Sequence, residues 1–415
     1  MMDNKRIDMK NCVFTICAKN YLAQALSLRE SCLKKCKNVD FFIFLSDLKD
    51  STLIPDYVIE LDQCWIKNWQ QMAFKYNVIE FSTSIKPFCF NKLFVEGYQK
   101  VIYLDPDIYV VNNLFPIYEM LNDFSIVLSP HYCNIQEKYA GSVTEEELLF
   151  VGIYNLGFTA IKNNDVGNKI IRWWCNRLAD KCYADHFDSL HVDQRWMDFI
   201  PAFFPDETLI THHPGINPAI WNLHERFLKL GINGEYQIAY NESKELFPLL
   251  FFHFSGFDPF NPKILNRRHP KYSINSFPSF KPLVEEYIEA EYRNGYDDFS
   301  KLEYSFNRFD DGTPILPIHR RLYRVFIAEN ASDYNPFASG SNFNNMLKKN
   351  GMLCKKKRNN NSNSNIRQAN KTLCDRVLHF CFYCLYKIIG IRCYSRFLAF
   401  LSRFSRFESQ FYLLK

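Results

Sequence analysis

The chain of 415 residues contains no run of 18 consecutive apolar residues, and the sequence therefore predicts no membrane-spanning helix. The polar segment 1–10 leads into a short apolar stretch that lacks the hydrophobic region and cleavage site of a signal peptide, which argues against secretion. Lys and Arg number 50 against 45 Asp and Glu, and a net charge of +5 is too small to indicate a nucleic-acid partner. We expect a globular protein in the cytoplasm.

Regularly spaced cysteines are also missing. The 14 cysteines are scattered along the chain, and the one CxxC pattern, Cys381 to Cys384, has no second pair. A zinc site or a redox motif is therefore not expected there. The cysteines are predicted to fill the core of a protein in a reducing compartment.

Glycine is scarce, and none lies in CAKNYLAQA, residues 17–25, which follows the first predicted strand. A dinucleotide-binding enzyme would carry G-x-G-x-x-G at this place, because glycine lets the backbone approach the phosphates. A nucleotidyltransferase that makes sugar nucleotides would carry a Gly-rich basic loop there. The first class is excluded and the second is disfavoured.

The first 260 residues alternate short β-rich runs with helical patterns. The predicted strands cover 13–17, 41–45, 58–61, 101–104 and 125–128, and helices are predicted over 22–33 and 88–98. This alternation predicts an α/β fold, with a mainly parallel mixed sheet and flanking helices. Ligands in such folds bind outside the carboxyl ends of the strands, so we expect the segments 19–21, 105–107 and 155–157 to line one crevice.

The composition changes near residue 340. We expect a catalytic domain over 1–335, a flexible basic Asn/Ser-rich linker over 336–371, and an amphipathic helical tail over 372–415. Aromatic and aliphatic residues of the tail share one helical face and arginines share another, which is typical of a helix at a membrane surface. The alternative is a helix that packs on the catalytic domain.

Two carboxylates, Asp105 and Asp107, follow the apolar run VIYL. Neighbouring carboxylates repel each other unless a cation lies between them, and an Asp-x-Asp pair can hold a hard divalent cation that bridges a diphosphate. A phosphatase of the haloacid-dehalogenase type would need Thr or Val where this chain has Tyr109. The remaining alternative is a solvated strand end.

Five segments occur in a characteristic order: FTICAKNYLAQALSLRESCLKK, IKPFCFNKLFVEGYQKVIYLDPDIYVVNNL, YNLGF, VDQ and FFHFSGFDPF. The set resembles nucleotide-sugar glycosyltransferases with the GT-A (Rossmann-like) fold, and most of all glycosyltransferase family 8 with its bacterial capsule and lipopolysaccharide branch. The resemblance covers about residues 11–330. It implies metal-dependent transfer of a hexosyl group from a UDP-sugar to a hydroxyl of a cell-surface glycan precursor, with retention of configuration.

The resemblance also implies a role for each matching residue. The metal ligands would be Asp105, Asp107 and His253, a set that suits Mn²⁺ better than Mg²⁺. The catalytic residues would be Asp193 and Gln194, which grip the sugar near its anomeric carbon. The implied donor-binding residues are Thr15, Cys17, Asn20, Tyr21, Lys86, Asp105, Asn155 and Gly157. The implied partners are a UDP-sugar and a glycan or lipid-linked glycan acceptor. The basic aromatic pattern of 372–415 separately predicts contact with the inner face of the membrane.

The chain departs from the family pattern at two places. After Gly256 the family continues with a lysine that contacts the diphosphate, whereas this chain reads FDPF, and Lys263, Arg267 and Arg268 are the candidate replacements. THHPGINPAIWNLHERF has no counterpart, so His213, Asn217 and Trp221 form either an acceptor or sugar pocket, or a structural turn with an aromatic plug. A non-catalytic glycan-binding protein on the same fold stays open as an alternative.

Overall fold

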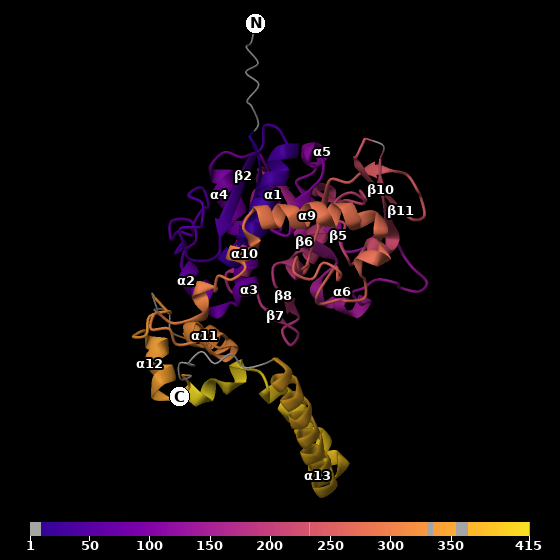
Figure 1. Cartoon of the computed structure of the whole chain (residues 1–415). Helices are drawn as coiled ribbons and strands as arrows, with labels where there is room; N and C mark the ends of the chain where they lie inside the picture. Colours follow the sequence, from indigo (N-terminus) through magenta and orange to yellow (C-terminus); the bar gives the residue numbers. More distant parts are fainter. Residues whose placement is uncertain (1–9, 232, 330–334, 354–363, 415) are drawn as a thin grey trace. The chain divides into compact units, whose positions relative to one another are not determined.

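The computed structural model describes residues 10–231, 233–329, 335–353 and 364–414, and the chain divides into two compact units (Figure 1). Unit 1 comprises the residues up to Met72 together with Val78–Ser305, and unit 2 comprises Ala73–Asn77 and the residues from Phe306 onward. The division lies earlier than the expected domain end at residue 335.

Unit 1 is built on a six-stranded mixed sheet. In sheet order its strands are β2 (Asp40–Leu45), β1 (Asn11–Cys17), β3 (Lys100–Leu104), β6 (Tyr154–Lys162), β5 (Ile126–Pro130) and β9 (Thr208–Ile210). The pairs β1–β2, β1–β3 and β5–β9 are parallel, and β6 runs antiparallel to both of its neighbours. The expected mainly parallel mixed sheet with flanking helices is confirmed.

Smaller strands complete unit 1. They are β4 (Ile108–Val110) with β13 (Phe251–His253), β7 (Ala184–Asp185) with β8 (Leu190–His191), and the three-stranded set β10 (Arg226–Leu230), β11 (Tyr236–Tyr240) and β12 (Phe247–Pro248). The strand expected over 58–61 is wrong, because only Ile59 pairs there, in a single bridge with Phe44.

Helices cover both faces of the sheet. Up to residue 305 the α-helices are α1 (Leu22–Lys35), α2 (Trp69–Lys75), α3 (Val78–Ser84), α4 (Lys86–Val95), α5 (Phe115–Asp123), α6 (Glu145–Val151), α7 (Asp165–Leu178), α8 (Ile200–Phe203), α9 (Lys281–Arg293) and α10 (Tyr296–Phe299). Successive residues of a strand point to opposite faces. On β1, Val13 packs in one cluster with Leu28 of α1 and Ile117 of α5, whereas the next residue, Phe14, contacts Phe90 of α4 with ring centroids 4.8 Å apart. The strands are apolar along their length because both faces are covered.

Unit 2 is centred on Phe74, whose ring contacts Phe309, Tyr323 and Phe343. The buried guanidinium of Arg320 donates hydrogen bonds to four carbonyls, those of Ala73, Phe74, Tyr76 and Phe306. The helices of this unit are α11 (Pro317–Glu329), α12 (Asn342–Lys349), α13 (Ser364–Phe404) and the short η8 (Glu408–Leu414).

Part of the expected linker is folded in unit 2. Ser341 caps α12 by accepting from the backbone N–H of Asn344, and Phe343 and Leu347 are buried in the cluster around Phe74. The prediction of a linker missed these two apolar side chains, which lie one helical turn apart within an Asn-rich sequence. The rest of the expected linker falls partly on 354–363, which lies outside the described residues.

Helix α13 is broken at Gly390, where φ is +70° and ψ is +165°. The rings of Tyr386 and Tyr394 have centroids 5.7 Å apart, whereas eight residues of a straight helix would separate the Cα atoms by about 12 Å. We infer that the chain folds back at Gly390 into a helical hairpin (Figure 1).

The hairpin exposes large apolar side chains, among them Phe380, Ile388, Ile391 and Phe400. By length and composition alone, Val377–Phe404 is apolar enough to cross a membrane, since an 18-residue stretch within it has a mean hydropathy of 1.2. The search for 18 consecutive apolar residues missed this segment, because a few basic residues interrupt it without making it polar. The break at Gly390 nevertheless divides the segment into two arms, neither of which is long enough to span a bilayer as a straight helix.

Candidate functional site

Asp105, Asp107 and His253 lie together at the carboxyl end of β3. The pairing of β13 with β4 sets His253 opposite Ile108, beside the aspartates that precede β4. Nε2 of His253 lies 3.1 Å from Oδ1 of Asp107 and 3.8 Å from Oδ2 of Asp105, and one ligand atom from each residue lies within 4.8 Å of the others. Two carboxylates and an imidazole are a suitable donor set for Mn²⁺.

The electrostatics of the cluster reflect burial and mutual charge. Burial alone would lower the pKa of His253, but the carboxylates of Asp107 and Asp105 outweigh it and raise that pKa. Burial raises the pKa of Asp105, although Lys86 and His253 oppose this. Burial would also raise the pKa of Asp107, yet the contact with His253 leaves it lowered. The cluster is thus one strongly interacting group of charges.

A directed chain of hydrogen bonds runs from the cluster to His131. Nδ1 of His253 donates to Oδ1 of Asn217 (3.2 Å), and Nδ2 of Asn217 donates to Oδ1 of Asn155 (3.0 Å). Nδ2 of Asn155 then lies 3.4 Å from Nε2 of His131, whose Nδ1 donates to the carbonyl of Ile153 (3.1 Å). With Nδ1 of His253 used as a donor, Nε2 is the nitrogen that faces the aspartates, and it would become a metal ligand once a cation displaced the proton that the carboxylates favour there.

Gly157 makes room for His253. A Cβ atom on Gly157 would lie 2.2 Å from Cε1 of His253 and 2.8 Å from Oδ1 of Asn155. Its carbonyl also accepts from the backbone N–H of Asp105 at 2.8 Å. The family resemblance implied a role for this glycine in donor binding, whereas in the structure the space beside it is filled by the imidazole.

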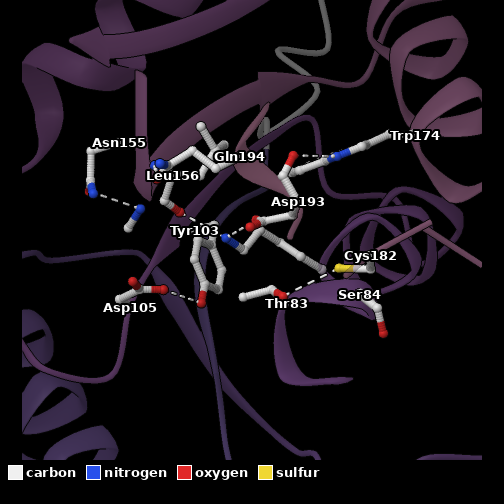
Figure 2. Close-up of polar contacts among 12 residues, drawn as sticks. Thr83, Ser84, Tyr103, Asp105, Asn155, Leu156, Trp174, Cys182, Asp193 and Gln194 are labelled. Atoms are coloured by element: carbon white, nitrogen blue, oxygen red, sulfur yellow. Dashed lines mark hydrogen bonds and ion pairs between the residues drawn. The ribbon is translucent and has the colours of Figure 1, made fainter. Parts of the chain in front are cut away.

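Lys86 and Asp193 form a buried ion pair. Nζ of Lys86 lies 2.5 Å from Oδ2 of Asp193, donates to the carbonyl of Leu156 (2.8 Å), and sits 4.1 Å from the ring centroid of Tyr103. Figure 2 shows these contacts around the labelled Tyr103, Leu156 and Asp193, and the hydroxyl of Tyr103 donates to Asp105 (2.5 Å). Tyr103 therefore links the ion pair of Lys86 and Asp193 to Asp105 of the metal cluster.

The side chain of Gln194 forms hydrogen bonds with the backbone of two elements. Its Oε1 accepts from the N–H of Leu156 (3.1 Å) and its Nε2 donates to the carbonyl of Val151 (2.8 Å). Burial raises the pKa of Asp193, against the opposing effect of Lys86. In the structure, Gln194 joins the start of β6 to the end of α6.

The four expected donor residues near β1 fall into two groups. The side chains of Thr15 and Cys17 are buried and do not reach the surface of the site. Asn20 and Tyr21 are partly exposed, and burial and the charge of Asp107 raise the pKa of Tyr21. The structure thus brings Tyr21 toward the metal cluster.

The loop after β13 returns to the cluster through Gly256, which has φ of +67°. The N–H of Arg267 donates to the carbonyl of Gly256 (3.0 Å), and Nδ2 of Asn266 donates to the carbonyl of Ser255 (2.5 Å). The charge of Arg268 contributes to the lowered pKa of Asp107, after the larger effects of burial and His253. Of the three candidate cations, Arg267 and Arg268 are therefore the two held beside the site.

The three residues expected to form an extra pocket, His213, Asn217 and Trp221, do not line one cavity in the structure. Asn217 belongs to the hydrogen-bond chain, and Trp221 packs edge-on against both His131 and His253, with ring centroids 5.6 and 5.1 Å away. His213 lines a different cavity of about 470 Å³, next to Phe247.

His131 is a site residue that the sequence reasoning missed. It directly follows β5, at the same sheet edge as Asp105 and Asn155. The rule that ligands bind outside the carboxyl ends of strands, which placed Asp105 in the site, would have found it. Asn155 instead lies at the amino end of β6, which reaches the same edge because β6 is antiparallel to its neighbours.

No protein-family model matches the chain. The chain is 23% identical over 319 residues to the uncharacterized protein YfnF of Bacillus subtilis (strain 168), a match that covers 72% of this chain and 98% of that protein.

Three solved structures are similar to the chain. The galactosyltransferase LgtC in complex with donor and acceptor sugar analogs is 14% identical, with a TM-score of 0.41 and coverage of 68% of this chain and 95% of that one. GlyE of Streptococcus pneumoniae TIGR4 is 16% identical (TM-score 0.30), and mouse xyloside xylosyltransferase 1 is 13% identical (TM-score 0.33). The match covers 50% of this chain in both cases, with 46% of GlyE and 87% of the mouse protein, so the chain spans about half the length of GlyE. These three neighbours are glycosyltransferases.

Proposed function

We propose that the chain is a metal-dependent glycosyltransferase that moves a hexosyl group from a UDP-sugar to a hydroxyl of a cell-surface glycan precursor. The observation that carries the proposal is the cluster of Asp105, Asp107 and His253. A solvated strand end gives no reason for a buried imidazole whose Nε2 faces two carboxylates, whereas a divalent cation in place of the ring proton would be bound by all three groups. Such a cation, Mn²⁺ or Mg²⁺, held by these three residues would supply charge neutralisation for a departing nucleoside diphosphate.

The chain supplies further positive charge for the diphosphate. In this proposal Arg267 and Arg268 take the place of the family's lysine, since the contact of Arg267 with Gly256 keeps both next to the cluster. Arginine binds phosphate oxygens through two parallel N–H donors. Tyr21 and Asn20 would contact the nucleoside.

The sugar would lie between Asn155 and Asp193. Because the carboxylate of Asp193 is already bound by Lys86, it is a poor candidate for a covalent nucleophile. We therefore favour front-face substitution with retention, in which the C–O bond to the diphosphate breaks as the acceptor oxygen bonds to the same face and a phosphate oxygen takes its proton. A glycosyl adduct on Asp193, detected by mass spectrometry, would contradict this route.

The test is isothermal titration of UDP into the full chain with Mn²⁺, with EDTA, and on Asp107→Ala. Asp123→Ala is the matched control, because that aspartate is exposed at the end of α5. We expect metal-dependent binding that Asp107→Ala loses and Asp123→Ala keeps. Equal binding with EDTA would favour the non-catalytic glycan-binding alternative. Binding of a nucleoside triphosphate and a sugar phosphate instead of UDP would favour a nucleotidyltransferase.

We also propose that α13 attaches the enzyme peripherally to the inner face of the membrane, where a lipid-linked acceptor would lie. Exposed apolar side chains and basic residues of the hairpin suit an interface with anionic lipid. Lys387 and Arg392 flank the turn at Gly390, so inserting the turn into the bilayer would bury charge. The second arm, 391–404, would span only about 21 Å of a hydrocarbon core of about 30 Å. A hairpin lying along the surface fits these facts better than one that crosses.

A further inference from the structure

A cavity of about 590 Å³ opens beside the proposed donor site. It lies between the segment that follows β5, represented by His131 and Tyr132, and helix α6, represented by Glu145, Glu146 and Leu149. His131 belongs both to the wall of this cavity and to the hydrogen-bond chain that ends at His253. The cavity and the proposed sugar site therefore share one side chain.

Both walls of the cavity are tied to the rest of unit 1. On one side, the buried carboxylate of Glu225 pairs with Arg226 and accepts from the backbone N–H groups of Cys133 (3.1 Å) and Asn134 (3.0 Å). On the other side, Gln194 holds the carbonyl of Val151 at the end of α6. A preformed cavity of this size is in the range of small-molecule sites.

The lining combines apolar surface with negative charge. Leu149 and Ile153 are 70% and 55% exposed, and the hydroxyl of Tyr132 donates to Oε1 of Glu145 (3.0 Å). Glu145 and Glu146 lie in the first turn of α6, and no Lys or Arg is among the described residues that line the cavity. Sugars suit such a surface, because their C–H faces pack on apolar side chains while carboxylates accept from their hydroxyl or ammonium groups. An anionic sugar would meet uncompensated repulsion.

His131 presents a hydrogen-bond acceptor at the boundary of the two sites. Because its Nδ1 donates to the carbonyl of Ile153, the lone pair lies on Nε2, and burial lowers its pKa to about 4, so the ring is neutral at physiological pH. The 3.4 Å separation between this Nε2 and Nδ2 of Asn155 is long for a hydrogen bond. A hydroxyl that approaches from the cavity could replace this weak contact with Asn155 and use Nε2 as its acceptor.

We propose that this cavity binds the terminal sugar of the acceptor, that this sugar is uncharged or carries an amine and is not a uronate or phosphate, and that Nε2 of His131 orients the hydroxyl to be glycosylated. This inference rests on the proposed function, because it names the class of acceptor for the proposed glycosyl transfer.

The test measures sugar binding directly, so that it does not depend on turnover. Saturation-transfer NMR with methyl glucoside, methyl glucosaminide and methyl glucuronide is recorded on the full chain, with and without UDP and Mn²⁺. We expect the first two sugars to bind at least ten-fold more tightly than the glucuronide. Leu149→Arg should lose sugar binding and leave UDP binding unchanged, and Glu146→Lys should shift the preference toward the glucuronide. His131→Phe should weaken binding of the glucoside. It should not change the preference for uncharged or amine-bearing sugars over the glucuronide, because that preference is attributed to Glu146.

The matched control is Val95→Arg, which places the same charge at a site that is 81% exposed at the end of α4, away from the cavity lining. Equal binding of the glucuronide, no sugar binding by the wild-type chain, or wild-type binding by Leu149→Arg would overturn the inference. Failure of UDP to bind, with the sugar results as expected, would instead overturn the proposed function and leave the cavity as a sugar site.

Discussion

Nδ1 of His253 donates a hydrogen bond to Oδ1 of Asn217 over 3.2 Å, and this contact decides which nitrogen of the imidazole faces Asp105 and Asp107. The amide cannot reverse without losing its second bond, because Nδ2 of Asn217 donates to Asn155. The orientation of a ligand is therefore fixed by a residue that does not face the proposed metal itself.

Asn217→Ala should weaken the affinity for Mn²⁺, measured in the presence of UDP, by roughly 10- to 100-fold, the usual effect of losing such a partner. Stability should fall as well, because Asn217 is fully buried and has a φ of +57°, which alanine tolerates poorly, so urea unfolding is measured on the same variant. Asn241→Ala removes an exposed amide from the nearby β11 region and should leave the affinity unchanged. An unchanged affinity in Asn217→Ala would show that the imidazole is oriented by other contacts.

Gly157→Ala should displace His253, because the added Cβ would lie 2.2 Å from Cε1 of the ring, closer than side chains approach. We expect metal-dependent UDP binding to be lost and the free energy of unfolding to fall by about 1–3 kcal/mol, a typical cost of overpacking. Urea unfolding and UDP titration measure the two effects. Gly340→Ala is the control, since a Cβ at that position would have no atom within 4 Å and φ is not positive there. A Gly157→Ala protein that binds UDP normally would mean that the ring moves without consequence.

Much of this site could be predicted from the sequence, and the reasons for the rest are physical. Asp105 and Asp107 stand out because charge at the end of a buried strand is costly without a partner. Asn217 lies 62 residues from Asn155, and only the folded chain shows that their amides meet. The family resemblance implied that Gly157 belongs to the donor site, but only the structure shows that an imidazole from β13 fills the space beside it. Likewise, α13 forms a hairpin because it is broken at one glycine, Gly390, and no sequence pattern predicts the backbone angles of that residue.

Glu291 makes stability depend on pH. It is 1% exposed on α9, and burial is the largest cause that raises its pKa to about 8, with the charges of Asp107 and Asp258 adding and Tyr287 opposing. The folded state keeps the proton up to about pH 8, whereas the unfolded chain loses it near the ordinary value of 4.5. Its contribution to stability is therefore full below about pH 4.5 and is lost as the pH rises toward 8.

Glu291→Gln should match the wild type in urea unfolding at pH 5 and exceed it at pH 8.5, by at most about 4 to 5 kcal/mol. The measurement is made with EDTA, so that no bound cation changes the charge near Asp107. Glu285→Gln on the same helix, whose side chain is 59% exposed, should change neither value. A difference between Glu291→Gln and the wild type that does not vary with pH would show that the carboxyl is ionised throughout.

The exposed hairpin gives a prediction about membranes. Ile388→Asp and Ile391→Asp place charges on side chains that are 80% and 62% exposed, next to the turn at Gly390, where solvent already reaches them. In water the two variants should fold normally, because no buried contact is lost. Burying a carboxylate in the apolar part of the interface is costly, so the fraction that sediments with anionic vesicles should fall several-fold. Higher salt should lower binding of the wild type as well, because it screens the attraction of Lys387 and Arg392 to the lipid. Val95→Asp, at an equally exposed position in unit 1, should sediment like the wild type. If all three variants bind vesicles as well as the wild type does, the hairpin is not the attachment.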